Sequence, residues 1–171
     1  MSALIRATAV TLLLVLNLLF WGTPVILLAL VKLLTLSRWR GVVTLTLFLA
    51  TRWVGINNRI FDALLPTRWN VEGTEGLRRD GRYLIISNHV SWVDVFALLR
   101  AFHGRTTFLR FFIKHGLIWF PIVGQAGYAL DFPFMRRYSA EYVERHPEKR
   151  GADLETTRRA CERYRGGPVA I

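Results

Sequence analysis

The stretch YLIISNHVSWVD, residues 83–94, decides the fold of this chain. Its first half, Tyr83–Ser87, is a mostly apolar run of the kind that forms a strand inside a parallel sheet. Its second half begins a helix, because Ser91 is a good N-cap and the apolar residues that follow, as far as Phe102, are spaced three and four apart. The stretch therefore predicts a strand, a loop and a helix, which together begin a βαβ fold.

The same order of elements returns along the rest of the chain. Further strands are predicted over residues 107–114, 128–135 and from 169 onward. Further helices are predicted over residues 115–127 and 152–165, the first of them bent or broken in two by Pro121. Strands that alternate with helices are joined by right-handed crossovers, which makes the sheet mostly parallel. We predict an α/β fold, a mostly parallel sheet with flanking helices.

The N-terminal part of the chain is hydrophobic. Residues 7–31 contain no charged side chain, and Asn17 is their only strongly polar residue. About 20 apolar residues cross a hydrocarbon core, so the run is long enough to span a membrane. Because Gly22 and Pro24 interrupt it, we expect either one kinked span or the two short legs of a re-entrant hairpin. A cleaved signal peptide fits less well, since the apolar run is too long and no clear cleavage site follows.

A second apolar segment, residues 42–65, is broken by Arg52 and Arg59. It is typical of an amphipathic helix at a membrane surface, with Trp39 and Trp53 suited to the level of the lipid headgroups.

Two regions follow from these patterns. Residues 1–65 are predicted to be a membrane-anchoring helical region, and residues 66–171 the N-terminal portion of an α/β domain.

The chain is basic, with 23 Lys and Arg against 12 Asp and Glu and a net charge of +11. Several of these cations, from Lys32 to Arg59, follow the first apolar run, and the positive-inside rule then keeps the remainder of the chain in the cytoplasm. The charge suits anionic lipid or an acidic carrier protein, and fixing topology is the simpler alternative. No nucleic-acid partner is expected, since no zinc-finger, RNP or helix-turn-helix signature is present. Cys161 is the only cysteine, which agrees with a reducing compartment.

His89 and Asp94 are the candidate catalytic residues. A base that titrates near neutrality and a carboxylate that orients it suffice to take a proton from a hydroxyl group. On one helix the two residues would lie about 140° apart, so they meet only if His89 lies in the loop and Asp94 in the first helical turn. Asp94 would then fix the tautomer of His89, whose other ring nitrogen takes the proton. Backbone N–H groups at the helix start would help a developing oxyanion.

The spacing of these residues also fits a purely structural role. Ser91 followed three residues later by Asp94 is a capping box, which accounts for Asp94 without chemistry and leaves His89 as an ordinary loop histidine. Ser91 lies in no G-x-S-x-G elbow, so a serine nucleophile is not favoured. The four histidines lack metal-ligand spacing, and no metal site is expected.

Three ordered blocks resemble one family. Asn88-His89-x-Ser91-Trp92-x-Asp94 resembles the first motif of the glycerolipid acyltransferases, the lysophosphatidic acid acyltransferase superfamily, in which His-x4-Asp is the catalytic dyad. Residues 114–124 resemble its Lys-x-x-Leu-x-x-x-Pro-x-x-Gly block. Phe134-Met135-Arg136-Arg137 resembles its second motif, Phe-Ile-x-Arg, whose arginine holds the phosphate of the acceptor. The likeness runs from about residue 75 to residue 171 and is greatest to the bacterial branch related to lysocardiolipin acyltransferases.

The resemblance implies an enzyme that moves a fatty acyl group from an acyl thioester to the hydroxyl of a lysophospholipid such as 1-acylglycerol-3-phosphate. His89 would be the general base, Asp94 its orienting partner and Arg137 the phosphate ligand, with Arg136 beside it. Acyl-CoA or acyl-ACP would be a co-substrate, no cofactor would be bound, and acyl carrier protein is a further expected partner. The protein would work at the bacterial inner membrane, a phospholipid membrane, with its catalytic part in the cytoplasm.

The chain also departs from the family pattern. The third family motif, a Glu-Gly-Thr-Arg box, is due just past Ile171. We therefore expect a C-terminally truncated portion of a longer enzyme, inactive on its own. Two other functions compete with this interpretation: a non-catalytic membrane protein with a basic surface that binds anionic lipid, and a lipid hydrolase that uses the same dyad on water.

Overall fold

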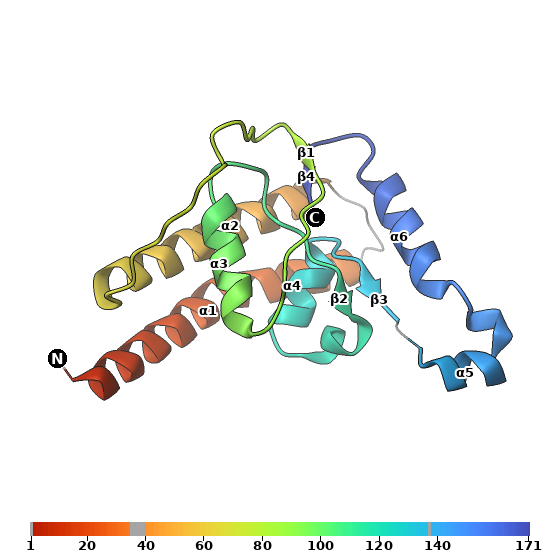
Figure 1. The fold of residues 1–171 in the computed structure, drawn as a ribbon, viewed down its shortest axis with the longest axis horizontal. Coiled ribbons are helices and arrows are strands. Elements are labelled where there is room, and N and C mark those ends of the chain that lie inside the picture. Colours follow the sequence, from red (N-terminus) through yellow and green to blue (C-terminus); the bar gives the residue numbers. More distant parts are fainter. Residues whose placement is uncertain (1, 35–39, 137) are drawn as a thin grey trace.

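The computed structural model describes residues 2–34, 40–136 and 138–171, and most of this chain is helical (Figure 1). The helices are α1 (Ala3–Leu34), α2 (Arg40–Leu64), α3 (Trp92–Phe102), α4 (Val123–Ala129), α5 (Ala140–Arg145) and α6 (Ala152–Arg163), with the 3-10 helices η1 (His115–Trp119) and η2 (Pro147–Lys149). The strands are β1 (Arg82–Tyr83), β2 (Ile113–Lys114), β3 (Phe134–Met135) and β4 (Val169–Ala170).

All of these strands pair in parallel. β1 pairs with β4, and β2 pairs with β3. The segment that leads into β2 joins the two pairs, because Leu109 bridges Ala170 and the Arg110 N–H donates to the Ala170 carbonyl at 2.8 Å. The strand order is therefore β1, β4, residues 109–114, β3. The predicted α/β fold is confirmed in part: the pairing is parallel, but each strand is only two residues long and helices dominate.

The ends of α3 and the break before α4 lie at the residues that the sequence predicts to cap or interrupt a helix. Ser91 caps α3, and Gly104, with φ at 74°, follows its end. Pro121 lies between η1 and α4, so the helix predicted over residues 115–127 is broken in two. Proline removes a backbone donor and clashes with the preceding turn, which prevents one continuous helix.

The N-terminal region is a pair of helices that lie along each other (Figure 1). α1 continues through Pro24 as one helix, so residues 7–31 do not form two re-entrant legs. Asn17, its one strongly polar residue within the apolar run, is buried against α2, where its Nδ2 donates to Asn57 Oδ1 at 2.8 Å and to the Trp53 carbonyl at 3.1 Å. α1 is long and apolar enough to cross a membrane, a property that signal sequences and buried core helices share.

The two helices share their core with the rest of the chain. Val54 of α2 packs in one cluster with Leu99, Leu109 and Ala170. Trp53, which the sequence suggested for the level of the lipid headgroups, packs against this cluster at the junction of α2 with α3. Trp39 lies outside the described residues. A second cluster, formed by Val25, Ala29 and Ala129, joins α1 to α4.

Candidate functional site

His89 lies in the loop that follows β1, and Asp94 lies in the first turn of α3. His89 Nδ1 is 3.4 Å from Asp94 Oδ2, and the two side chains are 63% and 33% exposed. The contact is looser than an ideal hydrogen bond. Among the described residues no hydrogen bond to His89 Nε2 is present, and the His89 side chain is 63% exposed, so this nitrogen is accessible from solvent.

The carboxylate of Asp94 also closes the start of α3. Its Oδ2 accepts from the Val90 N–H at 2.6 Å and from the Ser91 N–H at 2.7 Å, while the Ser91 hydroxyl accepts from the Val93 N–H at 3.2 Å. These contacts form a capping box. The backbone N–H groups of Ser91 and Val90, and then the charge of His89, hold the pKa of Asp94 below its usual range. One carboxylate oxygen therefore caps the helix and faces the histidine, so the helix cap and the dyad contact coexist.

Basic side chains follow the other strands at the same edge of the sheet as His89. In parallel strands the carboxyl ends share one edge, where ligands usually bind in open α/β folds. His89 follows β1, Lys114 ends β2, His115 follows it, and Arg136 follows β3. Arg136 Nη2 lies 3.1 Å from His115 Nε2, and this arginine is exposed. The arrangement suits an anion bound at this edge.

The two predicted phosphate ligands have different outcomes. Arg136 lies at the end of β3, three strand positions from β1, which corresponds to roughly 14 Å at a strand spacing of about 4.8 Å. Arg137 lies outside the described residues. Sequence reasoning missed His115 as a partner of Arg136, although its position directly after a predicted strand was a usable signal.

Large apolar side chains are exposed around the dyad. In the loop and first helical turn, Ile86 is 88% exposed, Val90 92% and Trp92 62%. Soluble surfaces rarely carry such contiguous apolar groups unless they meet a ligand, a partner or a membrane. Within the described part of the chain, no three His, Cys, Asp or Glu side chains come together as metal ligands.

The block over residues 114–124 has a structural basis. Pro121 separates η1 from α4. A Cβ on Gly124 would meet the backbone carbonyl oxygens of Leu117 and Ile118 well inside van der Waals contact. Only glycine therefore lets α4 begin directly over η1, which supports Lys114 and His115 at the edge of the sheet.

Comparison with known proteins agrees with this arrangement of motifs. No curated protein and no solved structure matches the chain. The family model described as Acyltransferase matches residues 68–165, more than half of the 171 residues. The matched segment contains His89, Asp94, the block around Pro121 and Arg136. The chain therefore belongs to the acyltransferase family.

Proposed function

We propose that this acyltransferase is membrane-anchored and moves a fatty acyl group from an acyl thioester to the hydroxyl of a lysophospholipid such as 1-acylglycerol-3-phosphate. The observation that carries the proposal is the contact between His89 Nδ1 and Asp94 Oδ2, at 3.4 Å, in an accessible loop after a parallel strand. With Nδ1 held by the carboxylate, Nε2 is the nitrogen that takes the proton.

The reaction needs few groups from the protein. The acceptor hydroxyl attacks the thioester carbonyl as Nε2 of His89 removes its proton, and the Asp94 carboxylate stabilises the imidazolium. The tetrahedral intermediate then collapses, the C–S bond breaks, and the imidazolium returns the proton to the leaving thiolate. The new ester bond joins the acyl group to the acceptor. Either acyl-CoA or acyl-ACP would supply the thioester.

The acceptor phosphate requires a binding position of its own. A phosphate group needs cations, and arginine offers a planar fork that matches its oxygens. We propose Arg137 as the phosphate ligand, with Arg136 beside it, and the 3.1 Å contact between Arg136 Nη2 and His115 Nε2 supports an anion position at this edge of the sheet. The exposed apolar side chains near the dyad and along α1 support an acceptor that is reached from a membrane.

The test replaces His89 with alanine. Cells express the complete reading frame, and their membranes receive acyl-CoA, 1-acylglycerol-3-phosphate and a thiol-reactive dye. His89→Ala should lower acceptor-dependent thiol release by at least about 10²-fold, the usual contribution of a general base. His146→Ala, which removes a histidine from the end of α5, is the matched control and should keep the rate.

Two other functions predict different results. A hydrolase releases thiol at the same rate when the acceptor is omitted. A non-catalytic lipid-binding protein releases none, and its binding to liposomes does not depend on His89. Release that survives His89→Ala at the wild-type rate would exclude this dyad as the catalytic site.

A further inference from the structure

α4 is bracketed by two residues in a strained backbone conformation. Ile122, directly before it, has φ at 65°, and Asp131, two residues after its end, has φ at 62°. They are the non-glycine residues with positive φ in the described chain. Such conformations are unfavourable, above all for a β-branched side chain, and persist only where the surroundings hold them. Contacts with the rest of the fold must therefore hold the two ends of α4.

α1 contacts both ends. At the first, the Ile122 side chain occupies the place where a Cβ on Gly22 would lie, so glycine lets the two segments meet. Between the ends, Val25 and Ala29 of α1 pack with Ala129 of α4. In Figure 1, α4 lies against the C-terminal half of α1. The docked half of α1 thus belongs to the core of the acyltransferase fold.

Lys32 holds the second end. Its side chain is 7% exposed, and its ammonium lies 3.0 Å from Asp131 Oδ1 and donates to the carbonyls of Tyr128 and Ala129, each at 3.0 Å. An ammonium has three donors, and these three acceptors satisfy them all. A lysine is buried only when it is paired in this way.

Asp131 connects this contact to the rest of the domain. Its Oδ1 is also 2.9 Å from Arg163 Nη1 of α6, and its backbone carbonyl accepts a hydrogen bond from the Tyr164 hydroxyl. The next residue is held too, because the Phe132 N–H donates to the Gly127 carbonyl at 2.8 Å. β3 begins three residues after Asp131, and Arg136 follows β3 directly. Lys32 is thus linked to Asp131 by direct contact, and Asp131 is linked to β3 and Arg136 by the short stretch of chain that follows it.

We propose that Lys32 and Asp131 are positioning residues of the acceptor site: the ion pair between them docks α1 on α4 and so holds β3 and Arg136 where the acceptor phosphate binds. The inference rests on the proposed function and adds to it. α1 is the helix proposed to enter the membrane, so its placement and acceptor binding are coupled through one buried contact.

The main test variant is Lys32→Met. It removes the buried charge together with the contact, whereas Asp131→Asn leaves Lys32 buried without a counter-charge. Gly22→Ala disturbs the opposite end of α4 and is an independent second variant. Arg59→Met, which removes an exposed cation from α2, controls for lost attraction to the membrane.

Two measurements are made on the protein in lipid nanodiscs. Hydrogen exchange should speed up at residues 130–136 in Lys32→Met and in Gly22→Ala, and stay unchanged in Arg59→Met. The dissociation constant for 1-acylglycerol-3-phosphate should rise about five- to tenfold in the first two variants, within the range for residues that act through others. Binding of the uncharged monoacylglycerol should not change. A general loss of structure would instead weaken the binding of both lipids.

Each outcome decides something. Unchanged exchange, or faster exchange with unchanged phosphate-acceptor binding, overturns the positioning role. If the variants lose affinity equally for the phosphate-bearing and the uncharged lipid, the ion pair only stabilises the fold, and the positioning role is also overturned. If wild-type protein binds the phosphate lipid more tightly than Lys32→Met but transfers no acyl group, the proposed function alone is refuted. Wild-type protein that does not bind the phosphate lipid refutes both.

Discussion

At the scale of single residues, the Asp94 carboxylate makes both contacts that the sequence spacing offered as alternatives, the helix cap and the contact with His89. Asp94 accepts from the backbone at the start of α3 and faces His89 through the same oxygen. The helix cap fixes the direction of the carboxylate before any substrate arrives, which is the pre-organisation that an orienting carboxylate needs. A capping box at this position therefore supports a dyad instead of competing with it.

Gly124 gives a residue-scale prediction with a control in the same block. Gly124→Ala should lower the free energy of unfolding by about 1–3 kcal/mol or more, the cost of inserting a methyl group where backbone leaves no room. Gly116→Ala places its Cβ in open space and should have little effect. Thermal unfolding of both variants in the same detergent measures the difference. Equal melting temperatures for the two would contradict the packing of α4 on η1.

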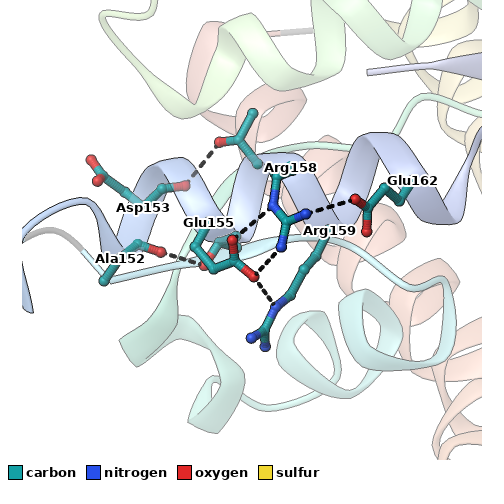
Figure 2. A network of polar contacts seen from close by, with 8 residues as sticks. Ala152, Asp153, Glu155, Arg158, Arg159 and Glu162 are labelled. Carbon is teal, nitrogen blue, oxygen red and sulfur yellow. Dashed lines mark hydrogen bonds and ion pairs between the residues drawn. The ribbon is translucent and has the colours of Figure 1, made fainter.

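At the scale of elements, α6 is stabilised along its surface rather than by a broad apolar face. Glu155 accepts from Arg158 at 2.9 and 3.0 Å and from Arg159 at 2.7 Å, and Arg158 reaches Glu162 at 3.0 Å (Figure 2). The pairs are three and four residues apart, the spacing at which side chains meet on a helix. α1, by contrast, is apolar, and the buried hydrogen bond between Asn17 and Asn57 fixes how it pairs with α2.

The network on α6 predicts a pH response. The hydrogen bonds from Arg158 and Arg159 lower the pKa of Glu155 from 4.5 to about 2. Because the folded-state pKa is depressed, the stabilisation is complete above pH 4.5 and disappears as the pH falls through about 2. NMR titration of the Glu155 carboxyl carbon measures the value directly, and Glu155→Gln should remove this part of the acid response. Titration of Glu155 near 4.5 would show that the network does not form in solution.

At the scale of the whole molecule, exposed apolar surface and positive charge occur together. On α1, Leu4 is 77% exposed, Phe20 71% and Leu34 82%, and the chain carries a net charge of +11. The two features bind a membrane by different physics, since apolar burial is insensitive to salt and attraction to anionic headgroups is screened by it.

Vesicle binding should separate the two contributions. The protein should bind neutral phosphatidylcholine vesicles, and bind more tightly when phosphatidylglycerol is added. Raising the salt from 0.1 to 1 M shortens the Debye length from about 10 to about 3 Å, so only the added increment should disappear. Co-sedimentation at both salt concentrations measures this, and Arg52→Gln with Arg59→Gln should reduce the increment alone. Release from neutral vesicles by salt would argue against apolar anchoring.

Features that depend on a few neighbouring residues were predictable from the sequence. The loop and helix around His89 follow from the Ser91 cap, and the break before α4 follows from Pro121, because caps and prolines act on backbone groups within one turn. Parallel pairing of the strands followed from the alternation of elements, but their length did not, because a strand persists only where a partner strand lies beside it. The roles of His89, Asp94 and the two arginines stay predictions.

Local sequence patterns were enough to identify the family, the order of strand, loop and helix around His89, and the long apolar helix at the N-terminus. The docking of α1 on α4 and the contact between Lys32 and Asp131, residues far apart along the chain, are visible only in three dimensions. The physical reason is that the ammonium of Lys32 can be buried only where folding has brought the Asp131 carboxylate and two backbone carbonyls to it, and no local pattern encodes that alignment.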